Sequence, residues 1–195
     1  MDRLISACYF AAVKHRSQKR KDKYGTPYIN HPIHVANLLV NAGVTDVDII
    51  IAGLLHDTVE DTGTTADEIT REFGARVSDM VMECTDDKTL PKVIRKQLQI
   101  EHAALISTGA KLIKLADKYS NLSDLICNPP TFWSAAEVRG YSYWSYAVYE
   151  QLRGTNIVFD KLFDDLFTGL DINGCPADKL SSELESYYHH IKNSD

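Results

Sequence analysis

Apolar residues recur at helical spacing along most of the chain, and no segment shows a convincing series of strands. Residues 4–21 carry an apolar stripe that gives way to a basic end. Pro32 stands in the first turn of a helix expected from His31 to Gly43, with Asn30 as its cap. Residues 47–55 are apolar on nearly every side, which is typical of a buried helix. The pattern predicts an all-α protein.

The rest of the chain follows the same pattern. Asp46 is expected to cap the buried helix, and capping boxes at Thr65 with Glu68 and at Ser134 with Glu137 open two others. Further helices are expected over residues 75–84, 91–106, 110–126, 157–168 and, with a weaker pattern, 177–192. The fold is therefore predicted as a bundle of roughly eight to ten helices. We expect one domain over residues 1–170 and a C-terminal tail with a possible helix over 171–195.

The composition is that of an ordinary globular domain, with 195 residues, 44% apolar and 25% charged. A net charge of −6 argues against a general nucleic-acid or anionic-membrane binder. No apolar run is long enough to span a membrane, and the N-terminus lacks a signal-peptide pattern. Four scattered cysteines without a CxxC pair indicate reduced thiols. We expect a cytoplasmic protein with no nucleic-acid or membrane partner, and no pattern specifies its oligomeric state.

The strongest chemical signal is an acidic segment that also contains histidines. No Lys or Arg occurs from Tyr24 to Thr70. The same segment holds Asp46, Asp48, Asp57, Glu60, Asp61, Asp67 and Glu68, together with His31, His34 and His56. His56 and Asp57 follow the buried helix at its carboxyl end, where the helix dipole disfavours a carboxylate. A divalent transition metal, which imidazole and carboxylate groups commonly bind, would supply the missing positive charge.

Two other segments supply candidates for the remaining ligands. The helix that begins at His31 is joined by a short loop to the helix that ends before His56, so the two are expected to lie antiparallel. On a later helix, one face carries Lys114, Asp117, Asn121 and Asp124. Asp117 is thus a candidate fourth ligand, although such a stripe by itself is more typical of a solvated helix face.

The other histidines give weaker signals. His34 lies one turn from His31, and a place on the helix surface is favoured over a supporting role at the metal. The histidines without acidic partners at ligand spacing are expected to be structural: His15, His102, His189 and His190.

A basic cluster stands out in this acidic chain. Six of ten successive residues are basic: Lys14, Arg16, Lys19, Arg20, Lys21 and Lys23. The cluster fits a solvated helix face or an import signal, or else a phosphate clamp opposite the metal. If the cluster is a phosphate clamp beside a metal that activates water, the site is expected to cleave phosphate esters. Of the aromatic run Tyr141, Tyr143, Trp144, Tyr146 and Tyr149, most are expected in the core and at most two at a base-binding site.

Four motifs together carry a family resemblance. They are Arg20-Lys21, Gly25-Thr26-Pro27-Tyr28-Ile29-Asn30-His31-Pro32, Leu54-Leu55-His56-Asp57-Thr58-Val59-Glu60-Asp61-Thr62, and Lys114-Leu115-Ala116-Asp117-Lys118 followed by Asn121-Leu122. In these motifs the chain resembles the hydrolase domain of RelA/SpoT homologues, within the HD-domain metal phosphohydrolase superfamily. It most resembles the stand-alone metazoan SpoT homologues, over about residues 3–168. The predicted helical bundle is then an HD-domain bundle.

The resemblance implies a role for each matching residue. His31, His56, Asp57 and Asp117 would bind one Mn²⁺ ion. Glu60 and Asp61 would position or deprotonate the attacking water and transfer protons. Substrate contacts would come from Arg20, Lys21, Lys92, Asn121 and Tyr141. The pair Tyr119-Ser120 departs from the relatives, which carry a bulky aliphatic residue and then Tyr, and this puts the packing around Asn121 in doubt.

The implied activity is that of a manganese-dependent (p)ppGpp 3′-pyrophosphohydrolase, which releases GDP or GTP and pyrophosphate. Animal relatives are also associated with removal of the 2′-phosphate of NADPH, so the expected partner is a small nucleotide, either ppGpp or NADPH. A different HD-type nucleotidase or phosphodiesterase would share the metal ligands without needing Arg20 and Lys21. A non-enzymatic nucleotide or metal sensor is least expected, because it would have no use for Glu60 and Asp61.

Overall fold

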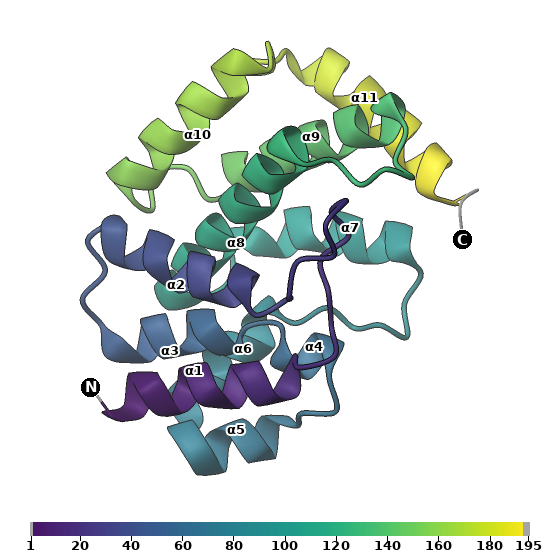
Figure 1. Cartoon of the computed structure of the whole chain (residues 1–195). Helices are drawn as coiled ribbons and strands as arrows, with labels where there is room; N and C mark the ends of the chain where they lie inside the picture. The colour runs from purple at the N-terminus through teal and green to yellow at the C-terminus, as the bar shows by residue number, and fades with distance from the viewer. Residues whose placement is uncertain (1, 193–195) are drawn as a thin grey trace.

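The computed structural model describes residues 2–192, and over this range the protein is all-α, as predicted (Figure 1). Ten helices of eight or more residues and one helix of four residues follow one another. Their bounds are α1 Asp2–Lys14, α2 Asn30–Asn41, α3 Val47–Leu55, α4 Thr58–Asp61, α5 Ala66–Phe73, α6 Ala75–Cys84, α7 Lys92–Ala103, α8 Thr108–Cys127, α9 Ala135–Glu150, α10 Ile157–Gly169 and α11 Ala177–Lys192. None of the described helices is both long and apolar enough to cross a membrane.

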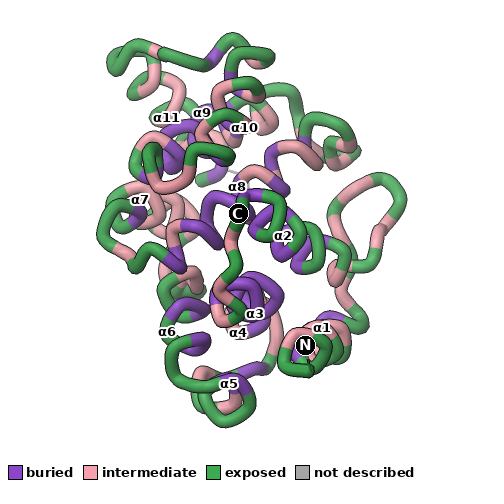
Figure 2. The backbone as a smooth tube through the Cα atoms, turned by 90° about the vertical axis from the view of Figure 1, so that its left-hand side faces the viewer, coloured by how far each residue is buried: buried purple, intermediate pink, exposed green. Residues whose placement is uncertain are grey.

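Helix α3 forms the centre of one half of the molecule, in contact with α1, α2, α6 and α8. All seven residues from Ile49 to Leu55 are buried, as Figure 2 shows by the colour of this helix. Burying one large aliphatic side chain stabilises a fold by about 1.5–3 kcal/mol, so a fully buried α3 is held firmly in place. The carboxyl end of α3 is therefore a rigid support for the residues that follow it. The buried helix predicted from the sequence is confirmed.

The first helix is shorter than predicted. It ends at Lys14, and residues 15–29 form an irregular loop instead of continuing the helix to residue 21. The loop folds back on itself, because the Arg20 N–H donates to the Thr26 carbonyl at 2.8 Å and Gly25 turns the chain with a φ of 61°. A positive φ is readily adopted by glycine. The basic residues after position 14 consequently lie on a loop and not on a helix face.

The predicted cap at Asn30 is wrong. Asn30 is the first residue of α2, and Ile29 occupies the cap position without a side-chain cap. The first amide groups are satisfied by a turn, since the N–H groups of Asn30 and His31 donate to the carbonyls of Pro27 and Tyr28. Backbone carbonyls of this turn therefore accept the hydrogen bonds of the first amide groups of α2.

The other predicted helix starts are confirmed, one of them in part. Asp46 accepts from the Asp48 N–H at 3.0 Å, and Ser134 with Glu137 forms a complete capping box. Thr65 caps α5, but only one half of its predicted box is present, because the carboxylate of Glu68 forms an ion pair with Lys14. The Glu68 side chain therefore links α5 to α1 and does not complete the capping box.

Residues 177–192 form the helix predicted there, α11, which packs along α9 and α7. Its side chains Tyr187 and Ile191 are buried. Tyr187 packs directly against the backbone of α9 at Gly140. A Cβ atom added at Gly140 would lie 2.9 Å from the Cβ atom of Tyr187. A small residue at this position lets the two helices approach closely. Residues 193–195 of the predicted tail lie outside the described part of the chain.

We expect Gly140→Ala to destabilise the protein by about 1–3 kcal/mol, because the new methyl group overlaps the Tyr187 ring and overpacks the interface. The better helix propensity of alanine, worth about 1 kcal/mol, offsets part of this cost. Chemical denaturation measures the change. Gly169→Ala on α10 is the matched control, since a Cβ atom there meets nothing within 4 Å. Equal stability of the two variants would contradict the tight α9–α11 contact.

Candidate active site

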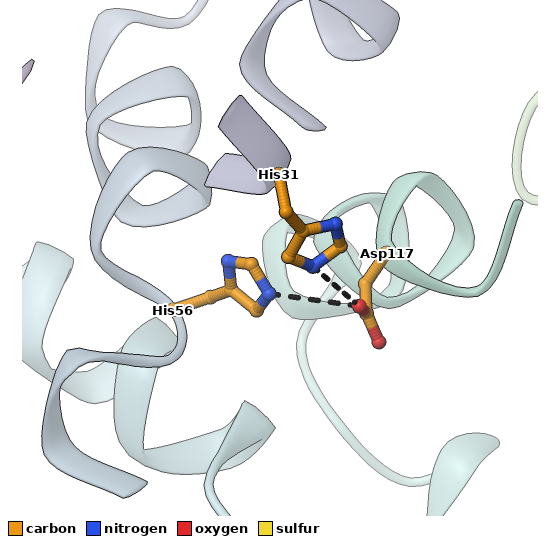
Figure 3. Close-up of side chains that lie close together, drawn as sticks. All are labelled: His31, His56 and Asp117. Atoms are coloured by element: carbon orange, nitrogen blue, oxygen red, sulfur yellow. Dashed lines mark hydrogen bonds and ion pairs between the residues drawn. The ribbon is translucent and has the colours of Figure 1, made fainter. Parts of the chain in front are cut away.

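Four side chains from three distant segments converge at the heart of the molecule. His31 lies in the first turn of α2, His56 and Asp57 follow α3, and Asp117 lies in the middle of α8. The His31 Nε2 atom is 3.2 Å from Asp117 Oδ1 and 3.6 Å from Asp57 Oδ2. Figure 3 marks the contact between His31 and Asp117 with a dashed line. The His56 Nε2 atom is 3.0 Å from Asp57 Oδ2 and 3.6 Å from Asp117 Oδ1. The α2–α3 contact also confirms the predicted pairing of these helices.

This donor set fits a divalent metal. Two ligand atoms that are each about 2.1 Å from one ion lie roughly 3.0 Å apart at a right angle and 3.4 Å apart at the tetrahedral angle. Two of the separations above, 3.0 and 3.2 Å, fall within that range, and the other two, at 3.6 Å, are slightly longer. His31, His56 and Asp117 each offer one ligand atom within 4.8 Å of the others. The His56 Nδ1–H donates to the Gly53 carbonyl at 2.8 Å, and the buried Nε2 atom lies 3.0 Å from Asp57 Oδ2 without the geometry of a hydrogen bond. A cation would satisfy this atom.

The electrostatics of the site favour ionised carboxylates. Burial raises the pKa of Asp117, but Lys118 and the two histidines outweigh burial and bring this pKa well below its usual value. Burial likewise works against the charge on Asp57, yet His56 draws the pKa of Asp57 below its usual value. The two carboxylates in turn raise the pKa of His56 well above its usual value, although burial alone would lower it. A buried site with two ionised carboxylates attracts a cation.

A second layer of residues holds the four side chains in place. The Tyr28 hydroxyl donates to Asp57 Oδ2 at 2.6 Å. Ser120 Oγ lies 3.0 Å from His31 Nδ1 and 2.9 Å from His34 Nδ1. Tyr28 and Ser120 were not predicted to have a role in the site, and His34 was expected on the helix surface. His34 is exposed, yet it supports the same hydroxyl that orients His31.

We expect Tyr28→Phe to weaken metal binding by about 10- to 100-fold, because loss of a hydrogen bond to a metal ligand typically has this effect. The aromatic ring, which stacks on His15, would be kept. Metal affinity is measured by competition with a chelating dye. Tyr24→Phe on the same loop is the control, since the Tyr24 ring is exposed. Unchanged affinity in Tyr28→Phe would show that Asp57 does not depend on this bond.

Two further carboxylates lie on α4 beside the four converging residues. Glu60 Oε2 accepts from the Asp86 N–H at 3.0 Å, and burial, assisted by neighbouring acids, raises the pKa of Glu60. Asp61 accepts hydrogen bonds from Gln18 Nε2 at 3.0 Å and from Lys88 Nζ. Both carboxylates are thus held by loop residues. A carboxylate with a raised pKa is suited to proton transfer near neutral pH.

A cleft runs past these groups. One cavity of about 460 Å³ and a second of about 390 Å³ lie on either side of the α4 carboxylates, which line both. The residues that were predicted to contact substrate line one or both cavities: Arg20, Lys21, Lys92, Asn121 and Tyr141. Arg20 is half-buried and donates to Asn121 Oδ1 at 2.9 Å and to Asp124 Oδ2 at 3.0 Å. The polar face of α8 therefore faces the cleft, not solvent.

The basic cluster contributes less to the cleft than its size suggests. Lys19, Arg20 and Lys21 line the first cavity, whereas Lys14 pairs with Glu68 on the other side of α1. Of the aromatic run, Tyr141 lines the cleft, and the other members are buried in the core, as expected. Trp133, which the sequence analysis did not single out, lies beside Tyr141 and also lines the first cavity.

The departure at residues 119–120 leaves Asn121 in place. Tyr119 packs edge-on against Phe163 of α10, and Ser120 turns toward His31. Asn121 Nδ2 donates to Asp117 Oδ1 and its Oδ1 accepts from Arg20. The Asn121 amide therefore links Asp117 to Arg20 on the loop of residues 15–29.

The helical fold and the paired His–Asp centre define an HD-domain protein, and the HD-domain family model matches residues 7–152. The chain belongs to this family. Within it, the chain belongs with the RelA/SpoT homologues, on the side of the metazoan SpoT orthologues, as its motifs predicted.

Two sequence relatives and one solved structure support this placement. The mouse and human proteins named guanosine-3′,5′-bis(diphosphate) 3′-pyrophosphohydrolase MESH1 are each 54% identical over 165 residues, which is 84% of this chain and 92% of theirs. A solved structure, described as a metazoan orthologue of SpoT that hydrolyses ppGpp and plays a role in starvation responses, aligns with a TM-score of 0.85. Its sequence is 45% identical, and the alignment covers 87% of this chain and 96% of the other.

Proposed function

We propose that this protein is a manganese-dependent (p)ppGpp 3′-pyrophosphohydrolase. The observation that carries the proposal is the convergence of two histidines and two carboxylates beside Glu60 and Asp61 in a cleft lined by basic residues. The curated relatives named for this activity support it. In the reaction, the oxygen of water joins the inner phosphorus of the 3′-diphosphate. The bond from that phosphorus to the ribose 3′ oxygen breaks, and this oxygen takes up a proton.

The metal would be held by His31, His56, Asp57 and Asp117. A divalent cation there supplies Lewis-acid activation of the phosphoryl group and of water. Manganese accepts this mixture of imidazole and carboxylate ligands, and it is the ion that the family resemblance implies.

The remaining groups have separate tasks. Glu60, with its raised pKa, accepts a proton from water, and Asp61, fixed by Gln18 and Lys88, orients that water. Arg20 and Lys21 bind phosphate oxygens, for which a guanidinium offers two parallel donors. Asn121 contacts the nucleotide near the ribose, and Tyr141 forms a wall of the pocket. Lys92 gives a further phosphate contact from α7.

The test is a steady-state assay of the purified protein on ppGpp and on NADPH, with added Mn²⁺ and after treatment with a chelator. We expect pyrophosphate and GDP from ppGpp, loss of turnover with the chelator, and recovery with Mn²⁺. Release of phosphate from NADPH alone would replace the proposed activity with a 2′-phosphatase at the same site. Absence of product from both nucleotides would refute the hydrolase assignment.

A further inference from the structure

Two basic side chains next to the candidate metal centre have no acidic partner. Lys114 on α8 is only 7% exposed, and it makes no hydrogen bond or ion pair with any residue from 2 to 192. Arg95 on α7 forms no ion pair within the same part of the chain, and its Nε atom is buried without a hydrogen-bond partner. A buried charge without a partner is costly, so Lys114 and the half-buried Arg95 are suited to receive an anion.

Both side chains point to the same place. They line the cavity of about 390 Å³ that also contains His56, Asp57 and Asp117, and a smaller cavity of about 200 Å³ adjoins it along Arg95 and Lys114. The acids of the smaller cavity accept hydrogen bonds from other groups. Glu83 accepts from Ser107, Asp86 from Gln99, and Asp87 from Thr89.

Along α8, Lys114 and Asn121 lie on opposite sides of Asp117, and Asn121 is the residue proposed to contact the nucleotide near the ribose. Lys114 lies one turn before Asp117, and Asn121 lies one turn after it, all on one helix face. Asn121 and its partner Arg20 line the cavity of about 460 Å³ that contains Trp133, whereas Lys114 and Arg95 do not line that cavity. His56, Asp57 and Asp117 line the cavity that holds Lys114 and Arg95, and none of the three lines the cavity that holds Trp133.

We propose that Arg95 and Lys114 form a subsite for the outer phosphate of the 3′-diphosphate. This inference rests on the proposed function. With the inner phosphorus at the metal and the nucleoside on the Asn121 side, the second phosphate extends toward the Lys114 side. Its oxygens accept charge-assisted hydrogen bonds from both side chains. A nucleotide with a single phosphate on the ribose has no group to place there, so the pair selects for a diphosphate.

Binding of inorganic pyrophosphate and of orthophosphate to the manganese-loaded protein tests the subsite by calorimetry. We expect Lys114→Met and Arg95→Met each to weaken pyrophosphate binding by about 10- to 100-fold, the usual effect of losing a hydrogen bond to a charged group, and to weaken orthophosphate binding much less. Methionine fills a similar volume and suits a buried position. Lys111→Met, one turn earlier on α8 and outside all the cavities described, is the matched control.

The second readout is kcat/KM for ppGpp, which should fall in the two variants and not in the control. If the wild-type protein does not hydrolyse ppGpp but the variants lose pyrophosphate binding, the substrate assignment falls and the diphosphate subsite stands. If the wild-type protein hydrolyses ppGpp but both variants bind pyrophosphate and turn over ppGpp like the control, the subsite is refuted and the enzyme assignment stands. Equal losses for pyrophosphate and orthophosphate would also refute the subsite.

Discussion

Replacing Asp117 with Asn should remove bound metal and hydrolysis together. The Asp117 carboxylate on α8 lies next to His31 and His56. A neutral asparagine in its place cannot offset the charge of a divalent ion. Lewis-acid activation contributes several kcal/mol, so we expect kcat to fall by roughly a thousandfold or more. Elemental analysis of the purified variant and an assay on ppGpp measure the two losses.

The same substitution also touches Lys118, whose buried ammonium group pairs with Asp117 Oδ2 at 3.0 Å. The asparagine oxygen can still accept this hydrogen bond, and a thermal unfolding curve shows whether the variant is folded. Asp79→Asn, at an exposed position on α6, is the control for a lost carboxylate. A folded Asp117→Asn protein that retains a full complement of metal would refute the assignment of this ligand.

Glu60→Gln should separate metal binding from turnover. Glu60 is not among the four converging side chains, so its amide variant should keep the metal, whereas loss of a positioned base typically costs about 10²- to 10⁴-fold in rate. The raised pKa of Glu60 gives the sign of the pH dependence. A base works only when ionised, so wild-type activity should fall as the pH drops through this pKa. The Glu60→Gln variant should lack this decrease in activity at low pH.

The measurements are kcat as a function of pH and metal content. Glu72→Gln, on the exposed face of α5, provides the matched control. If Glu60→Gln keeps wild-type turnover, the proton-transfer role is wrong. A nucleotide sensor, by contrast, would keep nucleotide binding and have no turnover to lose in either protein.

The helices and the central residues of the site were predictable because local patterns encode them. The apolar run of residues 49–55 requires burial, and a short connection forces α2 and α3 to lie side by side, which brings His31 to His56. The periodicity of α8 predicted Asp117 as a candidate ligand. In each case the deciding information lies within a few turns of the residue concerned.

What the sequence did not reveal depends on contacts between distant segments. Tyr28 meets Asp57 across 29 positions, and Ser120 meets His31 across 89. No pattern near Tyr28 or Ser120 records such a bond. The lack of an ion pair at Lys114 within residues 2–192 is likewise visible only once α7 and α8 are packed, because the nearby acids are then seen to accept hydrogen bonds from other groups. The early end of α1 also arises from the folded-back loop.

The loop over residues 15–29 contacts three separate parts of the candidate site. Gln18 holds Asp61, Arg20 reaches Asn121, and Tyr28 anchors Asp57, all within one turn-stabilised stretch. An insertion or deletion here would displace the hydrogen-bond partners of Asp61, Asn121 and Asp57 at once. Unlike most surface connections, this loop is therefore expected to tolerate few changes of length.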